Sequence, residues 1–257
     1  MEPFHLCRIS ARPLAHGFTT KRESQKRNSD FSFANKRREK TQSSGFTLIE
    51  LMVAFAIIIV ISAVVLTNQS SFNKTLILAN TAYDIALTLR AAETYGIGSR
   101  AAGVSANAGY GLNFQKAKPD SFTLFADAYP APSTLSVCHP TNDASAPDAR
   151  PGNCVYESSQ GEKVLDYVLG NGITVSDFCA YALGNWSCAY AQGGALSSLD
   201  IVFARPNPDP FISTNGSYSV VSPATAACIA ITSPHGGAHF ISIAASGQII
   251  ASAASCP

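Results

Sequence analysis

Glu50 is the one charged residue in a long apolar run, where a carboxylate inside a membrane would need a polar or charged partner. The run from Phe46 to Leu66 has 21 residues. As a helix rising about 1.5 Å per residue, it would be roughly 30 Å long, which matches a hydrocarbon core. An ionised carboxylate costs about 2.5 kcal/mol or more at mid-bilayer, so it is expected to have a partner. Alternatively, Glu50 marks the helix boundary in the headgroup layer, because it lies one turn from the start of the run.

Two histidines, His235 and His239, are close enough in sequence to begin a zinc site. No third or fourth ligand accompanies them, and the glycines between them favour a hairpin turn instead. A catalytic nucleophile would need a base such as one of these histidines or His139, and no motif such as G-x-S-x-G surrounds any serine. We therefore expect no enzymatic activity, no metal, no cofactor and no small-molecule substrate.

Six of the seven cysteines follow the apolar run, and an even number suits disulfides in an oxidising compartment. Six cysteines permit 15 sets of pairs, and the sequence does not decide between them. Nearness along the chain is therefore the only guide to the partners. Cys138 and Cys154 lie in one long loop, residues 128–161, which a disulfide would close. The other candidates are Cys179 and Cys188, which bracket a short insert, and Cys228 and Cys256, which could link the last strands to the C-terminus.

The elements that position these residues begin with a basic leader. Residues 1–45 hold ten Lys/Arg against four Asp/Glu, and residues 46–257 hold eight against thirteen. Basic residues hold their side of a span in the cytoplasm, so we expect the larger part of the chain to be extracytoplasmic. A secretory signal peptide is the competing interpretation. Its apolar core is shorter and is cut after small residues on the far side, and no such site follows Leu66.

The helix is expected to continue beyond the span as an amphipathic helix over residues 67–98. Glycines at 96 and 98 would end it. Its apolar residues recur about every three and a half positions, which predicts a stripe that packs on the protein's own sheet. That predicted stripe consists of Phe72, Leu76, Ala79, Tyr83, Ala86 and Leu87.

Everything after residue 98 is expected to be β structure, in six to eight short strands. Residues 109–114 and 121–126 alternate in polarity around Lys118-Pro119-Asp120, which predicts a hairpin. Further strands are expected at 163–169, 173–176, 199–203, 227–231, 240–243 and 248–250. The predicted fold class is α+β, with one long N-terminal helix packed on an antiparallel β domain over residues 99–257.

The segment Gly45-Phe-Thr-Leu-Ile-Glu-Leu-Met-Val53, with Lys36-Arg-Arg-Glu-Lys40 before it and an apolar helix after it, resembles the prepilin-type processing site of type IV pilins and type II secretion pseudopilins. The resemblance implies that a prepilin peptidase cuts between Gly45 and Phe46 and methylates the new amino group of Phe46. It also implies that Glu50 pairs with the Phe46 ammonium of a neighbouring subunit in a filament of other pilins. The 45-residue leader is long for the family. Either the start codon is assigned too far upstream or this chain is a long-leader variant. The proline that many members have late in the apolar helix is absent.

The rest of the chain is similar in outline to H-type minor pseudopilins and related minor pilins, whose fold is pilin-like. The residues that carry this likeness are Leu87-Thr-Leu-Arg-Ala-Ala92, the hairpin at 109–127, Val202-Phe-Ala-Arg-Pro-Asn-Pro-Asp209 and Gly247-Gln-Ile249. Residues 128–161 and 176–195 depart from it as insertions. The resemblance implies a structural subunit, first in the inner membrane and then in a pseudopilus or pilus.

A DNA-uptake or adhesive minor pilin at a pilus tip is the alternative function. Binding of nucleic acid requires clustered Lys and Arg to neutralise phosphates. Only eight such residues follow Leu66, and they are dispersed among twelve acids. We therefore do not expect nucleic acid as a partner.

Overall fold

The computed structural model describes residues 45–98, 100–101, 106–134, 138, 143–206, 208–252 and 255–256, without the side chains of residues 67–72. The predicted leader, apart from Gly45, and His139 lie outside these residues. The chain divides into two compact units, Met1–Leu51 and Met52–Pro257.

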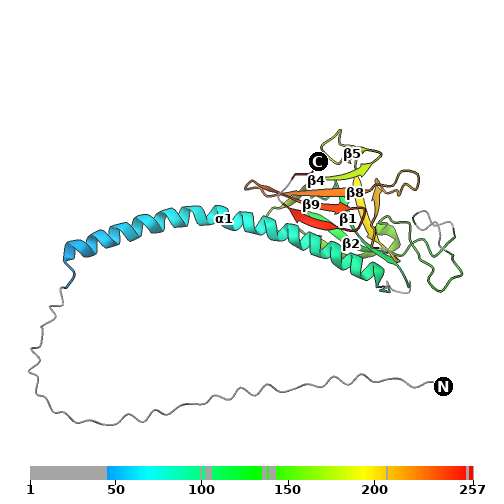
Figure 1. The fold of residues 1–257 in the computed structure, drawn as a ribbon, viewed down its shortest axis with the longest axis horizontal. Helices are drawn as coiled ribbons and strands as arrows, with labels where there is room; N and C mark the ends of the chain where they lie inside the picture. Colours follow the sequence, from blue (N-terminus) through cyan, green and yellow to red (C-terminus); the bar gives the residue numbers. More distant parts are fainter. Residues whose placement is uncertain are drawn as a thin grey trace, which may run out of the picture. The chain divides into compact units, whose positions relative to one another are not determined.

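The first element is the 50-residue helix α1, Leu48–Ile97 (Figure 1). No glycine or proline occurs from residue 48 to residue 95, and alanine and leucine are frequent, which favours a long uninterrupted helix. The helix ends where predicted, with the amide of Gly98 donating to the carbonyl of Thr94 at 2.9 Å. Gly96 is needed for packing, because a Cβ there would lie 2.0 Å from the carbonyl oxygen of Phe203.

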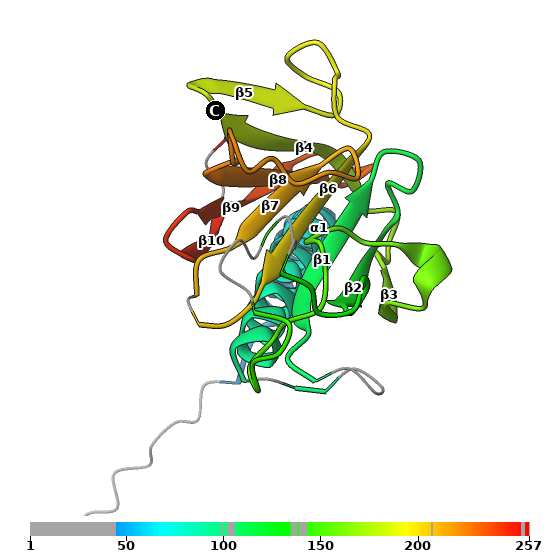
Figure 2. The same ribbon diagram turned by 90° about the vertical axis from the view of Figure 1, so that its right-hand side faces the viewer.

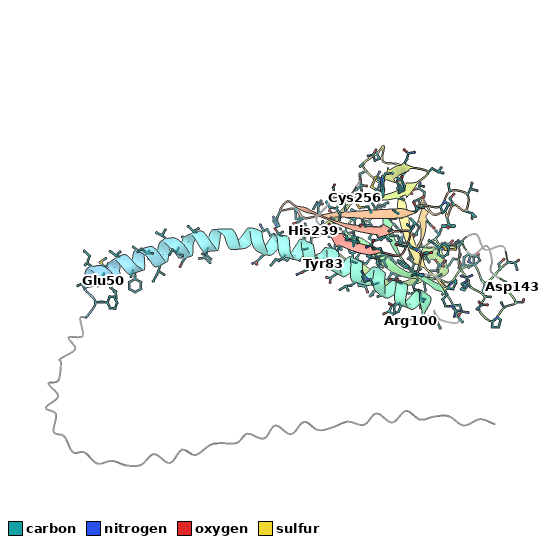
Figure 3. The ribbon with its side chains drawn as sticks, in the orientation of Figure 1. Glu50, Tyr83, Arg100, Asp143, His239 and Cys256 are labelled. Carbon is teal, nitrogen blue, oxygen red and sulfur yellow. A yellow bond between two sulfur atoms is a disulfide. The ribbon has the colours of Figure 1, made fainter. Side chains whose placement is uncertain are left out.

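The predicted apolar stripe of α1 was wrong in most of its members. Tyr83, labelled in Figure 3, is 58% exposed, Leu87 is 61% exposed and Leu76 is 44% exposed, while Ala86 is buried as expected. Ala79 is half-buried, and the side chain of Phe72 is not described. The buried stripe is instead Leu78, Ala82, Ile85, Leu89 and Ala92. Both stripes have the helical period, so periodicity could not distinguish them, and the small alanines of the buried stripe let the sheets approach the helix.

Ten strands form two antiparallel five-stranded sheets. The first sheet has the order β3-β2-β1-β6-β7, and the second has the order β10-β9-β8-β4-β5. In chain order the strands are β1 Gly109–Gln115, β2 Ser121–Asp127, β3 Lys163–Val168, β4 Thr174–Ala182, β5 Asn185–Cys188, β6 Ser198–Phe203, β7 Phe211–Thr214, β8 Ala226–Thr232, β9 Ala238–Ala244 and β10 Ile249–Ser252. A short 3-10 helix, η1 Ser158–Gln160, precedes β3.

All the predicted strands are present, and two more were missed. The β1–β2 hairpin has the predicted turn, with Leu112 opposite Leu124. The segment 176–195, predicted as an insert, instead continues β4 and turns at Leu183-Gly184 into β5, with Tyr181 opposite Trp186. Both turn residues have positive φ, and neither β5 nor β7 exceeds four residues. Such short strands carry too little alternation to be recognised from sequence.

The core lies between α1 and the two sheets. Figure 2 shows β1 and β6 crossing in front of α1. The largest fully buried side chains come from the helix and from both sheets, so that α1 and the strands share one apolar core. They include Leu78, Ile85 and Leu89 of α1, Leu112 and Phe114 of β1, Phe203 of β6, Phe178 of β4 and Ile229 of β8. The helix C-terminal to residue 77 is therefore part of the β domain, consistent with an α+β fold.

Candidate processing and assembly site

The apolar start of α1 is an uncovered hydrophobic surface. Residues Leu48–Leu66 have a mean hydropathy of 2.9, and none of their side chains is buried in the protein. Phe46, just before the helix, is 82% exposed. Water would disfavour so much apolar area, whereas lipid or neighbouring apolar helices would cover it. The segment is long enough for a single-pass membrane anchor.

Thr47 caps this helix, a role that the sequence reasoning missed. Its Oγ1 accepts a hydrogen bond from the amide of Glu50 at 3.3 Å, and its carbonyl accepts from the amides of Glu50 and Leu51 at 3.1 Å each. Thr47 therefore lies at the N-cap and Glu50 three positions later. The spacing Thr-x-x-Glu is the sequence signature of a capping box, so the signal was available.

The cap places the Glu50 side chain in the first turn of α1, labelled in Figure 3. The partial positive charge at a helix N-terminus stabilises a carboxylate in that turn by about 0.3–1 kcal/mol at exposed sites. The helix end therefore offsets part of the cost of an ionised Glu50 in an apolar environment. A cation beside Glu50 would offset more, and an amino group on Phe46, four residues earlier, would be such a cation in the same or a neighbouring chain.

The bond between Gly45 and Phe46 lies in an accessible segment. Residues 45–47 are exposed and are not helical. A Cβ placed on Gly45 would meet no atom within 4 Å. Proteases bind extended backbone, so the non-helical segment before α1 is a suitable position for cleavage, and any requirement for glycine at 45 must come from outside the folded chain.

His235 and His239, the histidines considered for a metal or catalytic site, lie in another part of the described chain. His235 lies in the turn between β8 and β9, where Gly236 and Gly237 both have positive φ and the amide of Gly236 donates to the Ser233 carbonyl at 3.0 Å. The predicted turn is therefore confirmed. His239 lies on β9 opposite Ile231. Within the residues that the structure describes, no nucleophile is hydrogen-bonded to either imidazole.

The six cysteines after the span form three disulfides, in the pairs that proximity suggested. They are Cys138–Cys154, Cys179–Cys188 and Cys228–Cys256. In the described chain, two groups of side chains are close enough to hold a metal ion, and each consists of one aspartate beside a disulfide. One group is Asp127 with Cys138 and Cys154, and the other is Asp177 with Cys179 and Cys188. Sulfur atoms in a disulfide are not thiolate ligands, so these cysteines cross-link the chain instead.

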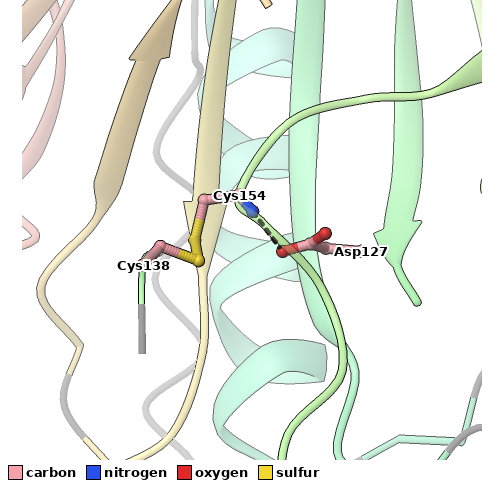
Figure 4. A group of neighbouring side chains, drawn as sticks. All are labelled: Asp127, Cys138 and Cys154. Atoms are coloured by element: carbon pink, nitrogen blue, oxygen red, sulfur yellow. Dashed lines mark hydrogen bonds between the residues drawn. A yellow bond between two sulfur atoms is a disulfide. The ribbon is translucent and has the colours of Figure 1, made fainter. Parts of the chain in front are cut away.

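Buried carboxylates anchor the long loop between β2 and β3, another feature not foreseen from sequence. Asp127 accepts hydrogen bonds from the amides of Asn153 at 3.0 Å and Cys154 at 2.8 Å, beside the disulfide (Figure 4). Glu162 accepts from the amides of Ala128 and Tyr129 at 3.0 Å each. These bonds tie both ends of the loop to the strand ends.

Burial raises the pKa of each of these acids. The pKa of Asp127 is well above its usual value, first because of desolvation and second because of the nearby Glu162 charge. Desolvation raises the pKa of Glu162 to about 7. Asp200 on β6 is also buried, and desolvation raises its pKa to about 7 although Asn113 donates a hydrogen bond to it at 2.7 Å. The loop anchors are therefore sensitive to pH.

Comparison with known proteins identifies one segment. Residues 40–66 match the family model described as the prokaryotic N-terminal methylation motif. No curated protein and no solved structure matches the chain. The matched residues include Gly45, Phe46, Glu50 and the whole apolar run, and the motif indicates a type IV pilin-like precursor. The likeness of residues 87–249 to H-type minor pseudopilins has no counterpart among these matches.

Proposed function

We propose that this chain is a minor pilin or pseudopilin, a structural subunit of a type II secretion pseudopilus or a type IV pilus. The methylation motif over residues 40–66 carries the proposal. An uncovered apolar helix followed by a disulfide-bonded β domain supports it, since such a chain needs both a membrane and neighbours. The absence of a motif for catalysis fits a mechanical role.

A prepilin peptidase is proposed to cut between Gly45 and Phe46 and to methylate Phe46. The exposed, non-helical segment at 45–47 supports this position, because it is accessible up to the point where α1 begins. Residues 1–45 would then be a cleaved cytoplasmic leader, and residues 46–66 would remain as the transmembrane helix. The basic leader supports this orientation, with residues 67–257 on the extracytoplasmic side of the inner membrane.

Assembly is proposed to bring the Glu50 carboxylate to the amino group of Phe46 in a neighbouring pilin. The new ammonium is created only by cleavage, so an uncut precursor lacks the partner charge. Leaving either charge unpaired in an apolar bundle is costly, whereas the pair with good geometry offsets that cost. The capped first turn supports the pairing, because Thr47 fixes the helical turn that carries Glu50.

The N-terminus of the mature protein tests the processing step. We expect mass spectrometry of the protein from its own cell to show N-methylated phenylalanine at residue 46 and loss of residues 1–45. Gly45→Val should leave the precursor uncut. A Cβ at 45 meets no neighbour, so a folding defect would not explain that result. A mature protein that begins after Leu66 would refute the proposal.

Glu50→Val tests the assembly step separately. We expect normal cleavage and membrane insertion but loss of the subunit from sheared filaments. Glu50→Asp, which keeps the charge, should retain part of the incorporation. If Glu50 only marks the helix boundary in the headgroup layer, the valine variant will enter filaments at the wild-type level.

A further inference from the structure

A small cavity with several polar side chains in its wall lies where α1 first meets the β domain. Leu78 is the first buried residue among the α1 side chains that the structure describes after Leu66, and a Cβ on Gly237 would contact its side chain at 3.4 Å. Lys74 lies eight residues after Leu66 along the helix, which is about 12 Å at 1.5 Å per residue. The headgroup layer extends about 5–7 Å beyond the hydrocarbon core. An extended lysine side chain therefore reaches that layer.

Two turns of the β domain form the other walls of the cavity. One turn places the amide of Ile173 at 3.0 Å from the carbonyl of Gly170, and the other is the β8–β9 turn that contains His235. The turns touch, because a Cβ on Gly172 would lie 3.0 Å from Cγ of Pro234. The cavity has a volume of about 340 Å³ and is lined by Lys74, Ile77, Asn171, Ile173, Ser233 and His235.

The polar groups of this cavity are hydrogen-bond donors. Lys74 supplies an ammonium, Asn171 an amide, His235 an imidazole and Ser233 a hydroxyl. The Ser233 oxygen accepts from the amide of His235 at 3.3 Å, which leaves its proton available to donate. Among the residues that the structure describes, no Asp or Glu lines the cavity. Such a set of donors fits the oxygens of a phosphate.

The surrounding charge makes this arrangement unusual. The chain after Leu66 has eight Lys/Arg against twelve Asp/Glu, yet the segments 170–173 and 233–239 contain no acid. The acidic domain therefore presents a site with one lysine, one histidine and no carboxylate at the end nearest the apolar start of α1. Charged groups within about a Debye length of that surface, about 8–10 Å, interact with its anionic lipids.

We propose that this cavity binds the phosphate of an anionic lipid headgroup, in the leaflet from which α1 emerges. A span that fixes the domain beside the membrane keeps lipid phosphates at high effective concentration, so that a weak site is occupied there. The contact holds the β domain against the membrane in the unassembled subunit and must break when the subunit leaves it. The inference rests on the membrane span of the proposed function and not on cleavage, Glu50 or filament assembly.

Hydrogen exchange of the full chain in nanodiscs tests this site. The protein is placed in phosphatidylcholine alone and in phosphatidylcholine with phosphatidylglycerol. We expect amide exchange in residues 170–173 and 233–239 to be about fivefold slower in the anionic discs, and high salt to abolish the difference. Lys74→Gln should remove most of this protection. The matched control is Lys163→Gln, since Lys163 lies on β3 and pairs with Asp166 at 3.0 Å.

Three outcomes would overturn the inference. Equal exchange in the two kinds of disc would exclude anionic lipid as the ligand. Equal loss of protection in both lysine variants would mean a diffuse charge effect instead of a site. The same protection from inorganic phosphate in phosphatidylcholine discs would identify free phosphate, not lipid, as the ligand. Because each measurement uses unassembled protein, failure of the filament proposal would not affect it.

Discussion

Replacing Asp200 by asparagine should stabilise the protein above neutral pH. Asp200 is 1% exposed on β6, and burial raises its pKa from 3.8 to about 7. The folded state therefore holds a proton that the unfolded state loses. Stability contributed by this group is complete below pH 3.8 and falls as the pH rises to about 7. The loss is about 4 kcal/mol, at 1.36 kcal/mol per pKa unit, and is an upper bound for a relaxed structure.

The asparagine removes this loss and keeps an oxygen for the bond from Asn113, which is 2.7 Å long. We expect Asp200→Asn to raise the free energy of unfolding at pH 8 by about 2–4 kcal/mol. At pH 5 the folded wild-type acid keeps its proton but the unfolded acid is already ionised, so the gain should be smaller there, about 1–2 kcal/mol. Urea unfolding of the disulfide-intact chain in detergent at both pH values measures this difference.

The control is Asp143→Asn in the long loop between β2 and β3. Asp143 is exposed, and hydrogen bonds from Ser145 lower its pKa, so its removal should give no gain at pH 8. If Asp200→Asn has the same stability profile as wild type between pH 5 and pH 8, the buried acid is not the source of the pH dependence. The reasoning that burial keeps Asp200 protonated would then be refuted.

Three further predictions concern the helix and a disulfide. Thr47→Val should remove the cap, worth about 1 kcal/mol, and accelerate amide exchange in the first turn of α1, while Thr47→Ser should not. Ile85→Ala should cost about 2–5 kcal/mol in urea unfolding because Ile85 is fully buried, and Leu87→Ala should cost under about 0.5 kcal/mol; equal costs would contradict the assignment of the buried stripe. Replacing both Cys228 and Cys256 by serine should lower the free energy of unfolding by about 3–4 kcal/mol, because the bridge joins residues 28 apart in sequence. Removing the β4–β5 bridge, which joins residues nine apart, should lower it by about 1 kcal/mol less.

The sequence was sufficient for the elements whose signal is local and strong. The apolar start of α1, the end of α1 at its glycines and the β1–β2 hairpin follow from hydropathy, backbone freedom and alternation. The buried face of α1 did not follow, because two stripes with the same period compete and only the packed sheets choose Ile85 over Leu87.

The missed site features depend on contacts between distant residues. The role of Asp200 becomes visible only when β1 and β6 pair and place Asn113 opposite it. The anchors of the long loop likewise need β2 and β3 to be adjacent before Glu162 can reach the amide of Tyr129. Thr47 is different, since its capping spacing with Glu50 is local and was readable from the sequence.

The order of the disulfides along the chain bears on how the domain matures. Each bridge joins one cysteine to the next one in sequence, with separations of 16, nine and 28 residues. An oxidant that pairs these six cysteines two by two, in their order along the chain, would thus produce the native set directly. Formation of these disulfides needs an oxidant that accepts electrons from the thiols, but it does not need an isomerase that rearranges wrong pairs.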